Sequence, residues 1–245
     1  MKKWMISMTL IRAFLWILSP GALRAEDPAT KPWKDAGEVS VVSANGNSKA
    51  TTMSAKNTFT YAWTKSDLEL IGSALGAESQ DHVTAEQYLA SQKSTWKFTP
   101  DFYAYEKFAW DSNRFAGIRH RYDLSGGLGY NILNFPKDKL AGELGAGYVN
   151  EERTQPPRND YTAGRAFAKY THTFSPTASF FQSGEYLHDF KDSDDYRLST
   201  ETAVIASLST HLSLKASYVW KRSNKPPAGF SKDDTLTAVA LLVNY

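Results

Sequence analysis

The sequence predicts an all-β fold, an antiparallel transmembrane β-barrel of about twelve strands with short periplasmic turns and longer outer loops. Three observations predict it: short polar turns recur at an almost constant spacing, longer polar loops lie between them, and the last strand ends on an aromatic residue. Short turns that alternate with longer loops are typical of outer-membrane barrels. The same alternation predicts the compartment and the direction of each strand.

The short turns are expected at residues 64–67, 99–101, 135–139, 175–177 and 209–211. From centre to centre, and from the last centre to the C-terminus, the steps are 34, 36, 40, 34 and 35 residues. The longer loops are expected at residues 79–84, 111–117, 151–160, 191–195 and 224–234. Each step therefore holds two strands and one long loop.

The N-terminus has the pattern of a secretory signal, so residues 1–25 are expected to be cleaved. Lys2 and Lys3 supply the positive region, residues 13–18 a short apolar core, and Ala25 the cleavage site. Residues 26–36 are then a periplasmic N-terminal segment and residues 37–245 the barrel domain. Cleavage would remove four basic residues and no acidic ones, which changes the formal net charge from +2 to −2. The composition therefore does not support a nucleic-acid-binding protein.

The chain contains no cysteine, which excludes a disulfide framework and thiolate metal sites. Aromatic residues make up 13% of the chain, yet its mean hydropathy is −0.45. A barrel with a polar interior and aromatic girdles has this mixture. A soluble periplasmic β-protein, the alternative, would need a more aliphatic core.

The first strand is expected at residues 38–44, with a hairpin at Asn45 and Gly46, and the second at residues 49–63. Alternation with a period of two is clear at residues 122–132, 140–148, 198–208 and 211–221. Two strands fit less well. In residues 102–110 either face carries a charge, Glu106 or Lys107, and in residues 178–190 either choice turns Gln182 or Glu185 outward.

The last strand, at residues 236–245, has an outward row of apolar residues that ends on an aromatic one: Val239, Leu241, Val243 and Tyr245. This pattern resembles the signal that the barrel insertion machinery of the outer membrane recognises. The plain alternative is an ordinary terminal strand.

Three segments resemble a known family. They are Gly46-Asn47-Ser48 after the first strand, RFAGIRHRYDLSGGLGYNIL at residues 114–133, and AGELGAGYVNEE at residues 141–152. Together with their order and spacing they are similar to the salt-induced outer-membrane proteins, a bacterial β-barrel family of unknown function. Ser48 stands where the family usually has threonine, and the loop at residues 155–158 departs from its pattern. The resemblance implies an outer-membrane barrel linked by name to salt response, with no established activity, catalytic residue or cofactor.

The charged residues of the predicted inner face are the candidate site. Alternation places these residues in the lumen: Lys56, Glu69, Arg119, Arg121, Asp123, Glu143, Arg165, Lys169, Glu201 and Lys215. Opposed charges in a lumen can select solutes, or they can pair and close the barrel, and twelve strands do not decide between the two. We expect Arg119, Arg121 and Glu143 to lie together, because their strands adjoin.

Other chemistry finds less support. His172 with Ser175 and His188 with Asp189 lie at opposite ends of a strand, so they cannot form one catalytic triad. Asp192, Asp194 and Asp195 are acidic but lack the spacing of a calcium loop. Lys221, Arg222 and Lys225 could meet lipopolysaccharide phosphates at the outer rim, although simple solvation explains them as well.

The sequence thus predicts a monomeric barrel in the outer membrane that is not an enzyme and holds no cofactor. Its function is expected to be a passive small-solute channel or an envelope-stabilising barrel in salt or osmotic stress. A lipase-type or acyltransferase-type enzyme at the rim is the alternative. The expected partners are outer-membrane lipid and lipopolysaccharide, periplasmic chaperones and the insertion machinery.

Overall fold

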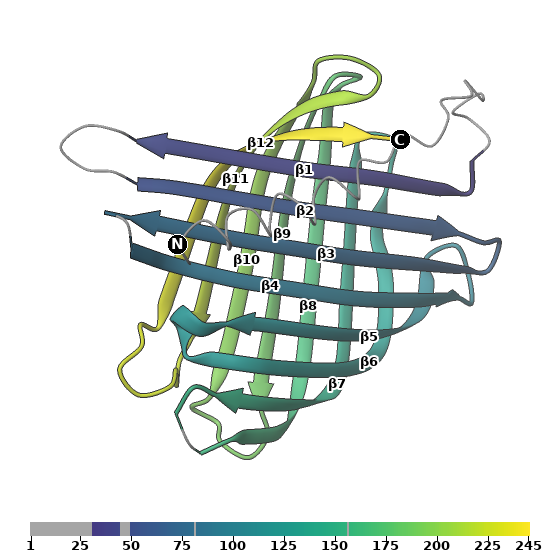
Figure 1. Cartoon of the computed structure of the whole chain (residues 1–245). Helices are drawn as coiled ribbons and strands as arrows, with labels where there is room; N and C mark the ends of the chain where they lie inside the picture. Colours follow the sequence, from purple (N-terminus) through teal and green to yellow (C-terminus); the bar gives the residue numbers. More distant parts are fainter. Residues whose placement is uncertain (1–30, 45–49, 81, 156) are drawn as a thin grey trace. The chain divides into compact units, whose positions relative to one another are not determined.

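The computed structural model describes residues 31–44, 50–80, 82–155 and 157–245. Within them, residues Pro32–Tyr245 form one unit, a closed barrel of twelve antiparallel strands (Figure 1). The predicted fold class is confirmed. The predicted signal peptide and the hairpin at Gly46, Asn47 and Ser48 lie outside the described residues.

The strands are β1 (Trp33–Ala44), β2 (Ala50–Ala62), β3 (Ser66–Ser79), β4 (His82–Lys97), β5 (Phe102–Asn113), β6 (Ile118–Asn134), β7 (Asp138–Arg153), β8 (Asn159–Ser175), β9 (Ala178–Asp189), β10 (Tyr196–Ser207), β11 (Leu212–Ser223) and β12 (Asp233–Asn244). A 3₁₀ turn, η1 (Arg114–Ala116), lies between β5 and β6. Each strand pairs with its neighbours in sequence, and β1 closes the ring against β12, with Ala36 opposite Asn244. Closure leaves no unpaired sheet edge, as a barrel in lipid requires.

All five predicted short turns join consecutive strands at one end of the barrel, here called the short-turn end. The opposite, long-loop end carries the β1–β2, β3–β4, β5–β6, β7–β8, β9–β10 and β11–β12 connections. The long loop predicted at residues 79–84 is wrong. Ser79 pairs with His82, so β3 and β4 run on to a tight turn in which Gln80 has a φ of 50°.

Alternation did not show which residues of β5 and β9 face inward, and the contacts of these two strands do. In β5, Glu106 is exposed on the outer face and Lys107 points inward to Glu185 of β9. In β9, Glu185 is therefore on the inner face, and Gln182 faces outward, where it accepts a hydrogen bond from Thr202.

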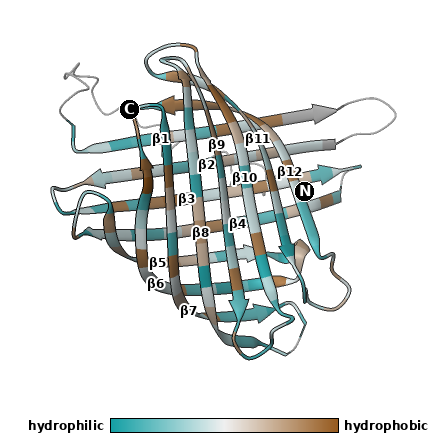
Figure 2. Cartoon of the chain, turned by 180° about the vertical axis from the view of Figure 1, so that it is seen from behind, coloured by the Kyte–Doolittle hydropathy of each residue, from teal (hydrophilic) through white to brown (hydrophobic). Residues whose placement is uncertain are grey.

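Hydrophilic and hydrophobic residues follow one another along the strands (Figure 2), and large apolar side chains are exposed on the outer face. Leu144 is 71% exposed, whereas the side chain of its neighbour Glu143 is only 1% exposed on the inner face. Exposed aromatic residues lie towards both ends of the outer face, with Tyr130 near the short-turn end and Tyr122 and Tyr148 near the long-loop end. An apolar band between aromatic girdles is the surface that a bilayer requires.

On the inner faces of β6 and β7, several glycines lie beneath the rings of two tyrosines. A Cβ atom at Gly129 would lie 2.3 Å from the ring of Tyr103, and one at Gly145 would lie 2.5 Å from the hydroxyl of Tyr105. Larger residues would push both rings off the wall. The glycine block at residues 126–129 therefore lets aromatic side chains lie flat inside this half of the barrel.

Candidate functional site

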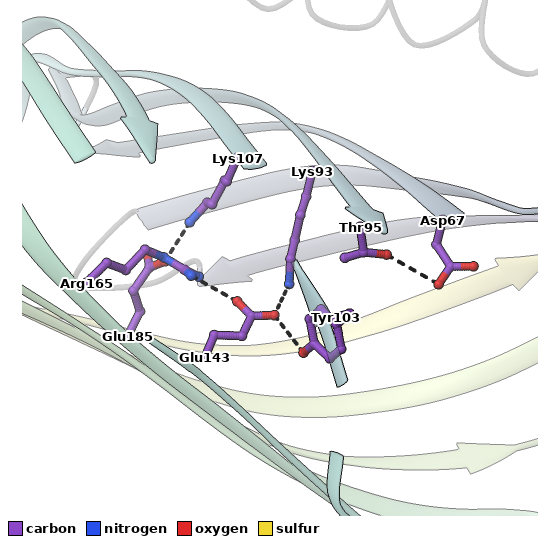
Figure 3. A network of polar contacts seen from close by, with 8 residues as sticks. All are labelled: Asp67, Lys93, Thr95, Tyr103, Lys107, Glu143, Arg165 and Glu185. Carbon is purple, nitrogen blue, oxygen red and sulfur yellow. Dashed lines mark hydrogen bonds and ion pairs between the residues drawn. The ribbon is translucent and has the colours of Figure 1, made fainter. Parts of the chain in front are cut away.

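A network of charged side chains occupies the barrel interior beside these glycines and tyrosines, and Glu143 is at its centre (Figure 3). Glu143 accepts hydrogen bonds from Lys93 of β4, from the hydroxyl of Tyr103 at 3.0 Å and from Nη1 of Arg165 at 2.9 Å. Arg165 of β8 also donates from Nε to Glu185 at 2.6 Å. Lys107 of β5 completes the set by donating to Glu185 at 2.7 Å.

The two lysine contacts run between strands that are not neighbours in the sheet. Lys93 and Glu143 lie on β4 and β7, and Lys107 and Glu185 lie on β5 and β9. Such bonds require side chains to reach across the interior. We call Lys93, Lys107, Glu143, Arg165 and Glu185 the interior charge network. It lies in the part of the lumen that faces β4–β9.

Aromatic rings hold the cations of this network in place. The guanidinium carbon of Arg165 lies 4.9 Å from the ring centroid of Tyr105 and 5.2 Å from that of Phe167. The ammonium of Lys93 lies 5.4 Å and 5.5 Å from the same two rings. Since the side chains of Glu143 and Arg165 are 1% and 3% exposed, cation–π contact replaces part of the hydration that burial removes.

A second group of charges lies on the opposite wall. Lys215 of β11 donates to Glu38 of β1 at 2.9 Å and forms an ion pair with Glu201 of β10 at 2.8 Å. Lys56 of β2 lies 4.0 Å from Glu38. This group borders open space, as Lys107 and Glu185 of the interior charge network also do.

That space is a cavity of about 670 Å³. Its lining residues come from every strand except β6 and β7, within the part of the chain that the structure describes. Four lysines and four carboxylates line it: Lys56, Lys107, Lys215, Lys221, Glu38, Glu185, Glu201 and Asp234. Small polar residues such as Ser73 and Ser217 lie between them. The lining thus combines apolar residues with charged groups that are balanced in sign.

Towards the long-loop end, Arg121 lies opposite Glu151 and bonds to it at 2.7 Å, with Asp111 3.6 Å away. Asp123, two residues further along the inner face, lies 3.5 Å from Arg197 of β10. The expected meeting of Arg121 with Glu143 is wrong, because Glu151 is eight residues further along β7, about 26 Å at the usual rise per residue.

Arg119 does not face the interior, which corrects the expectation from alternation. The register between β6 and β7 shifts between Ile118 and His120, so Arg119 occupies a bulge. Its side chain is 54% exposed and bonds to Glu152 at 2.9 Å. A bulge reverses the face of every residue beyond it, which alternation alone cannot foresee.

The two histidines that could take part in catalysis, His172 and His188, have other partners in the structure. Nδ1 of His172 lies 2.7 Å from Asp138, and the imidazole ring packs against Phe174. The imidazole thus contacts these two residues and not Ser175. His188 stacks on Tyr186 on the outer face, whereas Asp189 is buried. The hydrogen-bond partners of His172 are Asp138 and Tyr170, and that of His188 is Tyr186.

The acidic residues after β9 are used in loop contacts. Asp192 forms an ion pair with Lys225 and accepts a hydrogen bond from the backbone N–H of Asp194 at 3.1 Å. Asp195 is buried. The bond from Lys225 holds the pKa of Asp192 below its ordinary value. No group of three histidine, aspartate or glutamate side chains is gathered for a metal ion in the described ranges. Of the predicted rim cations, Arg222 pairs with Asp233 at 2.8 Å and Lys221 lines the cavity.

The predicted outward row of β12 lies as alternation required, since Val239, Leu241 and Tyr245 are exposed while Ala240 and Leu242 are buried. Val243 is half-buried. The sequence reasoning missed Lys93, Lys107, Glu185 and Glu38 as interior charges. Alternation from Trp96 outward along β4 would have placed Lys93 inside, but nothing in the sequence pairs it with Glu143.

Comparisons with known proteins agree with this architecture. A sequence profile described as a protein of unknown function, DUF481, matches residues 37–245. The uncharacterized protein YdiY of Escherichia coli strain K12 is 26% identical over 204 residues, which cover 82% of this chain and 79% of that protein.

Among solved structures, the NanC porin matches with a TM-score of 0.51 at 8% identity, over 86% of this chain and 97% of that one. The translocator domain of the autotransporter NalP from Neisseria meningitidis matches with a TM-score of 0.47 at 12% identity, over 98% and 95% of the two chains. At such low identity, the likeness to the NanC porin indicates a shared barrel fold and nothing further.

Proposed function

Since this chain belongs to the DUF481 family, whose function is unknown, we propose from the barrel interior that it is a passive outer-membrane channel for small polar solutes. The family resemblance drawn from residues 114–133 and 141–152 is confirmed by that membership. The observation that carries the proposal is the cavity of about 670 Å³, lined by four lysines and four carboxylates.

The outer surface supports the membrane location. Leu144, Leu128 and Leu241 are among the large apolar side chains exposed on the outside of the barrel. A soluble periplasmic protein would present all of these side chains to water. Large exposed apolar surfaces usually contact another protein or a membrane. Lipid is the environment that suits a closed barrel with an apolar exterior. Tyr245 at the end of this surface is proposed to serve as part of the insertion signal.

The lining supports the solute class. Four lysines face four carboxylates around the cavity, so the mean field along it favours neither anions nor cations. Small uncharged or zwitterionic polar solutes are therefore the proposed cargo. A fixed charge of one sign would have favoured an ion-selective pore.

The interior charge network favours a second candidate, a closed barrel with a structural role in the envelope. It occupies part of the lumen, and glycines of β6 and β7 are covered by tyrosine rings. Lys215 of the opposite wall is paired as well, with Glu38 and Glu201, and a barrel closed by such pairs would not conduct. A role in salt stress stays a prediction from the family resemblance, because no described residue carries it.

Single-channel recording from refolded protein in a planar lipid bilayer tests the proposal. Discrete conductance steps are expected, and Ser217→Tyr should reduce them because Ser217 lines the cavity. The adjacent variant Ala216→Tyr is the matched control, since Ala216 is exposed on the outer face. Silence from protein that shows the heat-dependent gel shift of a folded barrel would favour the structural role instead.

A further inference from the structure

The loop at residues 224–232 reaches from one side of the long-loop end to the other. It joins β11 to β12, yet Pro227 and Phe230 contact Gly117, at the start of β6. In the ring of strands, four strands separate these two hairpins in either direction: β7–β10 one way and β1–β4 the other. The contact therefore joins two hairpins that are far apart in the strand order, and Figure 1 shows the yellow loop between β11 and β12 beside the β5–β6 hairpin.

The far end of the loop is seated closely. A Cβ atom at Gly117 would lie 2.7 Å from the ring of Phe230 and 2.9 Å from Cβ of Pro227. Gly117 also has a φ of +79°, so glycine is required there both by the backbone and by the approach of the ring. Beside it Ile118 is 2% exposed. The β5–β6 hairpin thus provides an apolar seat for one aromatic side chain.

The near end of the loop is held by polar contacts. The backbone N–H of Asn224 donates to the carbonyl of Tyr196 at 3.0 Å, and its side chain donates to the carbonyl of Asp194 at 2.7 Å. Lys225 forms an ion pair with Asp192, and both side chains are 44% exposed. These bonds fix one end of the loop to the β9–β10 connection, while the other end depends on packing.

Beneath the loop is a small space of about 190 Å³, lined by Pro226 and Pro227 from above and by Arg121 and Arg197 from the wall. Ser199 and Lys221 line both this space and the cavity of about 670 Å³. The loop therefore covers the long-loop end of the path proposed for solutes.

We propose that residues 224–232 form a gate that closes the long-loop end of the barrel when Phe230 is seated on Gly117 and opens when it leaves. This inference rests on the proposed channel function. The apolar contact is the releasable part, since the far end is held by the packing of Phe230 and Pro227 without an ion pair among the described residues, and the bonds of Asn224 act as the hinge.

Thiol labelling tests the gate without requiring conduction, because the chain has no cysteine of its own. Ser199→Cys places one thiol below the loop, and its reaction with a water-soluble, membrane-impermeant reagent reports how often the gate is open. Phe230→Ala should raise the labelling rate about tenfold, the factor that corresponds to about 1.4 kcal/mol of lost contact. Phe190→Ala is the matched control, an exposed aromatic residue of the neighbouring β9–β10 connection, and should leave the rate unchanged.

A second variant guards against misfolding of the first. Ala116 and Ser231 line the same small space, from η1 and from the loop, so a short thiol cross-linker between cysteines at these positions should lock the gate. Cross-linking is expected to suppress conductance, and cleavage of the linker to restore it. Equal labelling of Ser199→Cys with and without Phe230 would overturn the gate. A strong labelling change in a barrel that never conducts would overturn the channel function and leave the loop movement established.

Discussion

Removal of the charge of Glu143 should destabilise the barrel more than removal of any exposed carboxylate. Glu143→Gln keeps the shape of the side chain and its capacity to accept the bond from Tyr103, 3.0 Å away. It leaves Lys93 and Arg165 without the carboxylate that both contact. Because the side chains of Glu143 and Arg165 are 1% and 3% exposed, water cannot replace that charge without opening the interior.

The magnitude follows from what each cation retains. Breaking a buried ion pair by removing one partner costs about 3–5 kcal/mol. Arg165 keeps Glu185 at 2.6 Å and both cations keep the rings of Tyr105 and Phe167. These remaining contacts place the expected loss for Glu143→Gln at the lower end, about 3 kcal/mol in the free energy of unfolding.

Equilibrium unfolding in urea from lipid vesicles, followed by tryptophan fluorescence, measures this difference. The matched control is Asp67→Asn, because Asp67 also forms an ion pair, with Lys97 at 2.7 Å, but both side chains are more than a third exposed. An exposed pair contributes less than about 1 kcal/mol, so the control should unfold close to the unaltered protein. If Glu143→Gln costs no more than Asp67→Asn, the interior charge network does not stabilise the barrel and the reasoning is refuted.

Three further predictions concern the wall, the cavity and the gate. Gly127→Ala should cost about 1–3 kcal/mol in the same unfolding assay, because its Cβ would lie 2.1 Å from a backbone carbonyl oxygen. Gly184→Ala, with nothing within 4 Å of the added carbon, is the control, and equal midpoints for the two would contradict the close packing. Lys215→Met should shift the reversal potential in a potassium chloride gradient towards cation selectivity, because its two carboxylate partners remain beside the cavity; an unshifted potential would mean that ions do not pass this wall. The ion pair of Lys225 with Asp192 should keep the near end of the loop attached to the β9–β10 connection from about pH 8 to about pH 5. The pKa of Asp192 is lowered from 3.8, so the carboxylate is charged throughout that range and loses the contact only as the pH falls through its lowered pKa. Gate opening, measured by labelling, should therefore be independent of pH in that range, and a rise by pH 6 would show that another group controls it.

The strand count, the face of most residues and the short turns could be predicted from the sequence because each depends on local pattern. Lys215, Glu143 and Arg165 each alternate with apolar neighbours, and that period of two places them inside without any knowledge of the partner strand. Short turns are marked by polar residues and proline in the same way. Residues 79–84 failed because polarity there does not interrupt the pairing of Ser79 with His82.

The partners of the charges could not be predicted, because they depend on register and on which walls approach each other. Lys93 meets Glu143 across the interior, beside Tyr103 and Tyr105, whose rings lie against glycines of β6 and β7. Arg119 left the inner face because of a one-residue bulge. The gate was also hidden, since the contact of Phe230 with Gly117 joins hairpins more than a hundred residues apart in sequence.

The most direct test of a solute path along one half of the barrel is a comparison of two single cysteines on the inner face. Ser73→Cys lies in the wall of the cavity, and Ser125→Cys lies in the filled half, where Ser125 is buried. A water-soluble thiol reagent should react readily with the cysteine at residue 73 and reduce the conductance, while the cysteine at residue 125 reacts slowly. Protection of both cysteines in the folded, membrane-inserted protein would contradict a water-filled path and with it the proposed channel.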